Sequence, residues 1–198
     1  MAKLYFCYAA MNAGKSTLLL QASYNYRERG MATLLFTAAL DDRAGTGVIA
    51  SRIGVSCDAQ LFTATDDLYA VIAAAHAQTP FSCVFFDEAQ FLTARQVWQL
   101  ARVADRLDVP VMCYGLRTDF QGKLFPGSAE LLAIADTLRE VRTICHCGAK
   151  ATMVVRHGPD GRPILEGDQV DIGGNDKYIS LCRRHWEETV GRWTETDN

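Results

Sequence analysis

A lysine and a serine near the start of the chain stand where a phosphate-binding loop needs them. Residues 9–17 read AAMNAGKST, after an apolar run at residues 4–8 and before a helical pattern at residues 18–29. Backbone N–H groups at the start of a helix hold phosphate oxygens, while the lysine reaches the β- and γ-phosphates and the serine hydroxyl binds Mg²⁺. Although Ala9 replaces the first glycine of the full motif, the order strand, loop and helix predicts a nucleotide-binding loop with Lys15 and Ser16 as its polar groups.

Two adjacent carboxylates follow another apolar run. Asp87 and Glu88 come directly after residues 83–86, which read CVFF. Because the carboxyl ends of parallel strands meet at one edge of a sheet, we expect both carboxylates beside the phosphate loop. Asp87 would then hold Mg²⁺ through water, and Glu88 would be a general base on a substrate hydroxyl or on water. Residue chemistry alone leaves a kinase and a nucleotide hydrolase both open.

Three cysteines and a histidine near the C-terminal end have the spacing of a metal site. They are Cys145, Cys147, Cys182 and His185. Three thiolates and an imidazole suit tetrahedral zinc, and four protein ligands leave no open position for chemistry, so we expect a structural site. The first pair, C-x-C, is shorter than usual, and His146 could displace one of these ligands. Reduced thiols without a metal are the alternative.

The elements that must position these groups are strands alternating with helices. Apolar runs without alternation predict strands buried on both faces of a parallel sheet; they are residues 4–8, 34–37, 83–86 and 109–114. Helical patterns cover residues 66–78 and 93–107, and Thr93 with Gln96 forms a capping box at the second helix. This order predicts an α/β fold in which helices flank a parallel sheet.

The pattern changes after about residue 143. Short β-prone pieces at residues 153–156, 170–172 and 178–180 are separated by Gly- and Pro-containing turns. We therefore expect a nucleotide-binding domain at residues 1–143, a zinc-clasped, β-rich subdomain at residues 144–190 and a flexible tail at residues 191–198. The polar stretch 41–54 is long for a connector, which is typical of a functional or mobile loop.

Composition narrows the class of protein. The 198 residues include 20 Lys and Arg against 23 Asp and Glu, which gives a net charge of −3. Proteins that bind nucleic acid normally have a basic surface, and this slightly acidic balance argues against that class. No apolar run approaches the roughly 18 residues that a membrane span needs. The first residues have the pattern of a strand rather than of a signal peptide, and seven cysteines are an odd number for a disulfide framework. We expect a cytoplasmic protein with neither nucleic acid nor membrane as partner.

Five motifs in order give the chain a family resemblance. They are MNAGKS at residues 11–16, DDR at 41–43, FDEAQF at 86–91, YGLRTDF at 114–120 and IGGNDKY at 172–178. Together they resemble the type II thymidine kinase family in its bacterial form, from about residue 3 to about residue 186. The resemblance implies transfer of the γ-phosphate of ATP to the 5′-hydroxyl of thymidine, giving dTMP and ADP. It also implies a homotetramer, feedback inhibition by dTTP and a structural zinc.

The resemblance also assigns roles to residues. Glu88 would accept the proton of the 5′-hydroxyl, Arg43 would approach the transferring phosphate, and Phe120 would stack on the thymine. ATP and Mg²⁺ would be bound by Ala9, Ala10, Met11, Asn12, Ala13, Gly14, Lys15, Ser16, Asp87, Ala89 and Gln90. The nucleoside would be held by Tyr178 and, through backbone groups of a lasso-like loop, by Gln169, Val170, Asp171, Ile172 and Gly173.

Two other classes of function compete with this one. A zinc-bearing NTPase that acts on nucleic acid would use Glu88 to activate water, and Arg183 with Arg184 is the compact basic pair near the proposed metal. A zinc-ribbon interaction module would keep a degenerate nucleotide loop for folding alone, but Lys15, Ser16 and both carboxylates are intact. ATP consumption separates the three, because only a kinase requires a nucleoside acceptor.

Overall fold

The computed structural model of the chain describes residues 1–41, 45–170 and 177–191. Arg43, Asp171, Ile172, Gly173 and all but the first residue of the predicted tail lie outside the described residues. Among the helices in the described ranges, none is long and apolar enough to cross a membrane.

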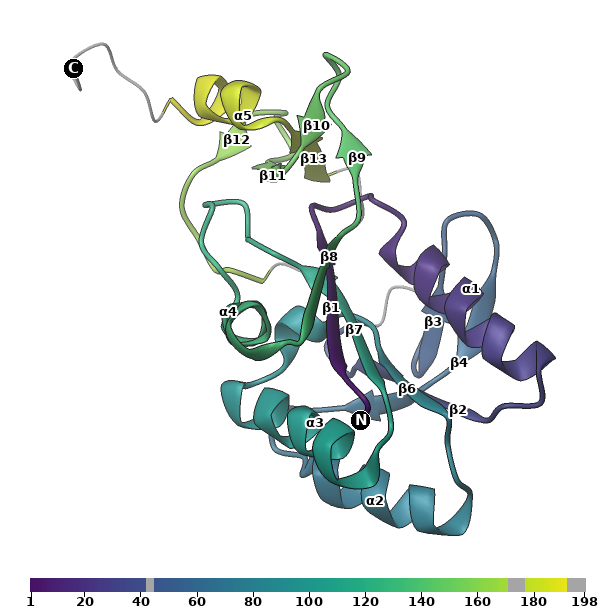
Figure 1. Ribbon diagram of the computed structural model, residues 1–198. Helices are drawn as coiled ribbons and strands as arrows, with labels where there is room; N and C mark the ends of the chain where they lie inside the picture. The colour runs from purple at the N-terminus through teal and green to yellow at the C-terminus, as the bar shows by residue number, and fades with distance from the viewer. Residues whose placement is uncertain (42–44, 171–176, 192–198) are drawn as a thin grey trace.

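A six-stranded parallel sheet forms the centre of the fold (Figure 1). From edge to edge its strands are β5 (Gln60–Phe62), β2 (Thr33–Ala38), β6 (Cys83–Phe86), β7 (Val111–Leu116), β1 (Leu4–Ala9) and β8 (Thr137–Glu140). Every neighbouring pair is parallel. The four apolar runs correspond to β1, β2, β6 and β7, so the predicted α/β fold is confirmed, whereas β5 and β8 were not predicted.

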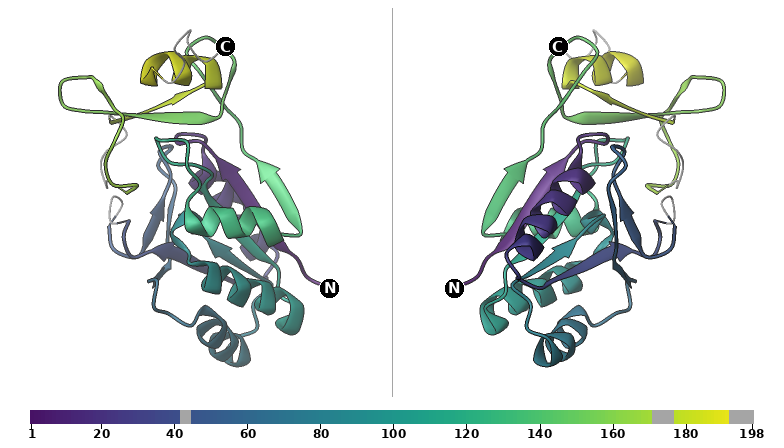
Figure 2. Two further views of the ribbon diagram at one scale, coloured as in Figure 1. Left: turned by 90° about the vertical axis from the view of Figure 1, so that its left-hand side faces the viewer. Right: turned by 90° about the vertical axis from the view of Figure 1, so that its right-hand side faces the viewer.

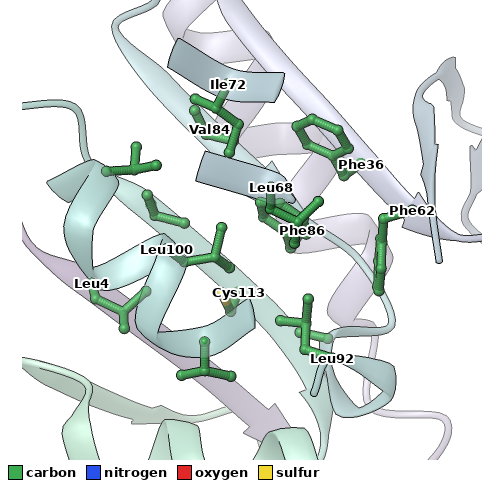
Figure 3. Close-up of a cluster of buried hydrophobic side chains, with 14 of the residues drawn as sticks. Leu4, Phe36, Phe62, Leu68, Ile72, Val84, Phe86, Leu92, Leu100 and Cys113 are labelled. Carbon is green, nitrogen blue, oxygen red and sulfur yellow. The ribbon is translucent and has the colours of Figure 1, made fainter. Parts of the chain in front are cut away.

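Helices cover both faces of this sheet (Figure 2). On one face lies α1 (Lys15–Glu28), and on the other lie α2 (Leu68–Gln78), α3 (Ala94–Leu107) and α4 (Pro126–Ile134). Because alternate strand residues point to opposite faces, Phe86 packs on the α2–α3 side and Phe85 on the α1 side. The rings of Phe36 and Phe86 stack with centroids 4.7 Å apart within the larger core (Figure 3). The capping box predicted at the start of α3 is confirmed.

The polar stretch at residues 41–54 contains a strand that the sequence did not predict. In it, β3 (Val48–Ala50) pairs antiparallel with β4 (Ser56–Asp58), and Ile49 is buried in the core that also holds α1. The turn between the two strands carries Arg52, whose guanidinium donates a hydrogen bond to the Asn12 side chain in the phosphate loop. This hairpin therefore contacts the phosphate loop.

The C-terminal elements lie beyond the carboxyl ends of β1 and β7 (Figure 1). They are β9 (Thr143–Ile144), β10 (Lys150–Ala151), β11 (Met153–His157), β12 (Pro163–Ile164), β13 (Tyr178–Leu181) and α5 (Arg183–Val190). Two of the predicted β-prone pieces correspond to β11 and β13, while Val170 of the third is not in a strand. The division at residues 143 and 190 into separate domains stays a prediction.

Hydrogen bonds join these C-terminal elements to the main sheet's carboxyl edge. The Ser180 hydroxyl on β13 donates to the Met11 carbonyl in the phosphate loop at 2.6 Å. The indole N–H of Trp186 on α5 donates to the carbonyls of Phe120 at 3.2 Å and Val154 at 3.0 Å. The small C-terminal core is thereby attached to both the phosphate loop and the segment that follows β7.

Candidate active site

One cavity of about 580 Å³ lies at the carboxyl ends of the sheet strands. Thirteen of the residues assigned from the sequence line it: Met11, Asn12, Ala13, Gly14, Lys15, Ser16, Asp87, Glu88, Gln90, Phe120, Gln169, Val170 and Tyr178. Ala9, Ala10 and Ala89 are buried and do not line it. Residues from segments far apart in the sequence therefore meet around one space.

The phosphate loop connects β1 to α1, and no side chain caps the N–H groups at the start of α1. Gly14 is the N-cap of α1 and has φ +79°, a left-handed conformation that glycine adopts without a Cβ clash. Asn12 is also left-handed, with φ +64°. The first turn of α1 contains no acidic residue that would neutralise the positive end of this 14-residue helix. Its N-terminal N–H groups can therefore bind an anion.

Lys15 is the buried cation of this loop. Its side chain folds back so that Nζ donates to the Ala10 carbonyl at 3.3 Å, and only 8% of the residue is exposed. Ala9 ends β1 with φ outside the left-handed region, so alanine fits where the motif has glycine. The substitution therefore leaves the loop intact.

Asp87 and Glu88 follow β6 and reach the cavity beside the loop. Desolvation by burial, and then the neighbouring Glu88 carboxylate, raise the pKa of Asp87 well above its ordinary value. The Ser16 hydroxyl donates a hydrogen bond to Asp87, and the Lys15 ammonium lies near enough to oppose that rise. A carboxylate and a hydroxyl in contact next to a phosphate loop are the ligands that Mg²⁺–ATP uses.

Gln90 orients the second carboxylate. Its Nε2 donates to the Glu88 carboxylate, and its Oε1 accepts from the Leu116 N–H at 2.9 Å. This amide is 1% exposed, and Gly115 makes room for it, because a Cβ on Gly115 would meet both Gln90 N and Oε1 at 2.9 Å. The side chain of Gln90 therefore ties Glu88 to β7.

Aromatic and amide groups form another wall. Asp119, 4% exposed, accepts from the Gln121 N–H at 2.9 Å and the Lys123 N–H at 2.8 Å, and its second oxygen accepts from Gln169 Nε2 at 2.8 Å. Phe120 follows in sequence and lines the cavity, as does Tyr178. Flat aromatic walls and a few fixed polar groups are typical of a site for a planar heterocycle.

Some residues that line the cavity were not predicted from the sequence to belong to the site. Arg52 and Val154 line the space, and Asp119 was noted only as part of a motif. Arg52 lies in the polar stretch at residues 41–54, whose length was the available signal. Val154 belongs to a β-prone piece that gave no indication of which residues it faces.

The four predicted metal ligands form one cluster. Their ligand atoms all lie within 4.8 Å of one another. His185 Nδ1 is 3.4 Å from Sγ of both Cys145 and Cys182, and Sγ of Cys147 is 3.9 Å from Sγ of Cys182. Zinc–sulfur and zinc–nitrogen bond lengths imply about 3.8 Å between sulfurs and about 3.5 Å from sulfur to nitrogen in a tetrahedral site. The cluster is thus compatible with structural zinc.

Local groups favour thiolate at the buried cysteine. Desolvation opposes ionisation of Cys145, but backbone N–H groups of Cys147 and Cys182 and the His185 ring outweigh it and lower the Cys145 pKa to about 6. His146 lies beside the cluster, with its ring 4.3 Å from that of His185 and its Nδ1 3.7 Å from Cys145 Sγ. In the described residues it is His185 that completes the set of four.

Comparisons with known proteins point to the same chemistry as the cavity. A sequence model described as thymidine kinase matches residues 2–186. A thymidine kinase of Agrobacterium fabrum is 68% identical over 189 residues, which cover 96% of this chain and 98% of that protein. A thymidine kinase of Photobacterium profundum is 58% identical over 192 residues, which cover 97% of this chain and all of that protein. With a phosphate loop, an Asp–Glu pair and an aromatic wall around one cavity, the chain belongs to the thymidine kinase family.

Proposed function

We propose that this protein transfers the γ-phosphate of ATP to the 5′-hydroxyl of thymidine, giving dTMP and ADP. The observation that carries the proposal is that one cavity is lined by the phosphate loop, the Asp87–Glu88 pair and the Phe120–Gln169–Tyr178 wall. A phosphoryl donor site and a site for a planar base therefore share one space. The names of the relatives support thymidine as the acceptor.

In this mechanism the loop N–H groups and Lys15 hold the triphosphate. Ser16 and Asp87 would hold Mg²⁺, which would supply positive charge to the phosphates as it does in other nucleotide enzymes. Glu88 takes the proton of the 5′-hydroxyl as that oxygen attacks phosphorus, and Gln90 keeps the Glu88 carboxylate in place. Arg43, in the resemblance, adds positive charge where negative charge builds up.

The acceptor side recognises the nucleoside. Phe120 stacks on the thymine, Tyr178 contacts the nucleoside, and the hydrogen bond from Gln169 to Asp119 holds Gln169 at the cavity wall. Zinc, held by Cys145, Cys147, Cys182 and His185, would supply cross-linking and no reaction step.

A panel of acceptors tests the proposal. Purified protein with Mg²⁺–ATP is given thymidine, deoxyuridine, deoxycytidine or uridine, and nucleoside monophosphates are separated by chromatography. We expect dTMP from thymidine at a rate well above that with deoxycytidine or uridine. Equal ATP hydrolysis without any phosphorylated nucleoside, or hydrolysis stimulated by nucleic acid, would instead identify an NTPase.

The resemblance extends the proposal to regulation and assembly. We propose that dTTP inhibits by occupying the same cavity, that the particle is a homotetramer and that the enzyme works in the cytoplasm. Inhibition by dTTP that is relieved by both thymidine and ATP, and four chains per particle by light scattering, are the expected results. Inhibition that neither substrate relieves would place dTTP at another site.

A further inference from the structure

Four charged side chains in the described residues are buried, and Arg156 is the one that lies outside the cavity wall. The other three, Lys15, Asp87 and Asp119, line the cavity. Arg156, on β11, is 5% exposed. A buried guanidinium is costly unless other groups replace its water, so its surroundings indicate what holds it there.

The guanidinium of Arg156 lies over the ring of Phe120. Its central carbon is 3.9 Å from the ring centroid, a cation–π contact. Phe120 lines the cavity and is 3% exposed, whereas Arg156 does not line it. The cation therefore covers the part of the ring that is turned away from the cavity.

The same guanidinium holds the segment that leads into Gln169 and Val170, which line the cavity. Its Nη1 donates to the Asp168 carbonyl at 3.0 Å. Asp168 directly precedes Gln169, whose amide reaches the Asp119 carboxylate at 2.8 Å. Within the described ranges, no carboxylate forms a salt bridge with Arg156, and its Nε has no hydrogen-bond partner. Among the described residues, the groups that face its charge are thus a ring and a carbonyl.

Gly167 leaves the space that this arrangement needs. Its φ is +134°, and a Cβ there would lie 2.6 Å from Arg156 Nη2. Glycine at this position therefore lets the backbone pass against the guanidinium while the next carbonyl accepts its hydrogen bond.

We propose that Arg156 is a positioning residue for nucleoside binding, which fixes the Phe120 ring and the Asp168–Gln169 backbone as one unit. The inference rests on the proposed function. A fixed ring loses little freedom when a base stacks on it, and a cation behind the ring draws π-electron density away from the cavity face. Both effects act on thymidine binding, whereas in the described residues no hydrogen bond, ion pair or ring contact joins Arg156 to the phosphate loop.

Arg156→Met tests this role, because methionine retains apolar packing and removes the charge and the N–H donors. We expect the KM for thymidine to rise on the order of tenfold while the KM for ATP stays within about twofold. Arg156→Lys restores a cation without the planar fork and should recover part of the loss. Arg162→Met changes an exposed arginine directly before the neighbouring β12; it is the matched control and should change neither KM.

Two further variants separate positioning from general destabilisation. Gly167→Ala keeps Arg156 but displaces its guanidinium, so it should raise the KM for thymidine in the same direction. In a double-mutant cycle, Arg156→Met should add little to the effect of Phe120→Leu, because either change alone already removes the contact between the guanidinium and the ring. Additive effects in the cycle, or equal rises in the KM of ATP and thymidine, would overturn the inference.

Failure of the inference differs from failure of the proposed function. If wild-type protein makes no dTMP, the proposed function is wrong. If wild-type protein makes dTMP and Arg156→Met keeps the wild-type KM for thymidine, the proposed function stands and the positioning role of Arg156 is wrong.

Discussion

Glu88 holds a backbone conformation that few side chains adopt. Its φ is +51°, and in the described residues only Asn12 and Asp108 share a positive φ without being glycine. Two of these three residues line the cavity. Such strain persists where surrounding contacts fix it, here the Glu88 N–H to Asp87 Oδ1 at 3.0 Å and the Gln90 amide. The turn directs adjacent carboxylates into one site.

Replacing Glu88 with glutamine tests its assignment as the base. An amide of the same shape cannot take the proton of the 5′-hydroxyl, so kcat should fall at least about 100-fold with little change in either KM. Initial rates of dTMP formation measure this. Glu28→Gln, at the exposed end of α1, should keep the wild-type kcat. Near-wild-type turnover by Glu88→Gln would show that another group accepts the proton.

The raised pKa of Asp87 predicts a pH dependence of stability in nucleotide-free, magnesium-free protein. A carboxyl group with a higher pKa in the folded than in the unfolded state binds its proton more tightly when folded. Its stabilising contribution is present below the ordinary Asp pKa and is lost as pH rises through the folded-state value. As pH rises from about 5 to about 8, the free energy of unfolding should therefore fall less for Asp87→Asn than for the wild-type protein.

Urea unfolding at both pH values measures this difference. Asp58→Asn, on the exposed β4, is the control and should follow the wild-type pH dependence. Mg²⁺–ATP should diminish the difference, because cations near Asp87 favour its ionised form. Parallel pH profiles for wild type and Asp87→Asn would contradict the raised pKa.

At the scale of elements, apolar runs predicted the buried strands and failed at the edges. Strands β1, β2, β6 and β7 have both faces covered, so apolar residues dominate their sequences, although β2 also contains Thr33 and Thr37. The edge strand β8 reads TLRE with no residue fully buried, and β5 buries only Phe62, so neither gives a pattern. Helix α4 has Gly127 in its first turn, which weakens a helical signal.

The candidate site likewise contains a part that the sequence predicts and a part that it does not. The phosphate loop and the Asp–Glu pair are local sequence motifs attached to predicted strands, so sequence alone places them. The contact between Phe120 and Arg156 joins β11 to the segment after β7, and no spacing rule connects residues so far apart. Tertiary packing also decides that Gln90 rather than solvent faces Glu88.

Gly115 on β7 tests how tightly the elements must pack to hold Glu88. A methyl group there would press on the buried Gln90 amide, so Gly115→Ala should destabilise the fold by about 1–3 kcal/mol and lower kcat. Denaturant unfolding and initial rates measure both effects. Gly158→Ala is the control, because the one close contact of its new Cβ would be the flexible Asp160 side chain at 3.0 Å, and its other neighbours would lie at 3.8 Å or more. A wild-type kcat for Gly115→Ala would contradict the role given to Gln90.

Helix α5 links the cluster of proposed zinc ligands to the cavity wall. Cys182 is the N-cap of α5, and Trp186, one turn later, donates to the Phe120 carbonyl. Cys182→Ser should abolish zinc binding and raise the KM for thymidine more than the KM for ATP. Zinc per chain is measured by elemental analysis, with Cys57→Ser, outside the cluster, as the control. Wild-type protein with well below one zinc per chain would contradict the metal site.

At the scale of the whole molecule, the phosphate loop and the C-terminal elements meet at one sheet edge (Figure 1). The Ser180–Met11 hydrogen bond joins them directly, and Trp186 and Arg156 both hold Phe120. The main sheet thus carries the proposed phosphate site, and the C-terminal elements support the wall proposed to bind the base.

The coupling of the two half-sites is the central claim, and one measurement tests it directly. ADP and dTMP are quantified together in reactions of wild-type protein with Mg²⁺–ATP, with and without thymidine. The account predicts ADP release that depends on thymidine and equals dTMP formation mole for mole. ADP release that is unchanged by thymidine, with no dTMP, would contradict the account and leave Phe120 and Tyr178 as ordinary packing residues.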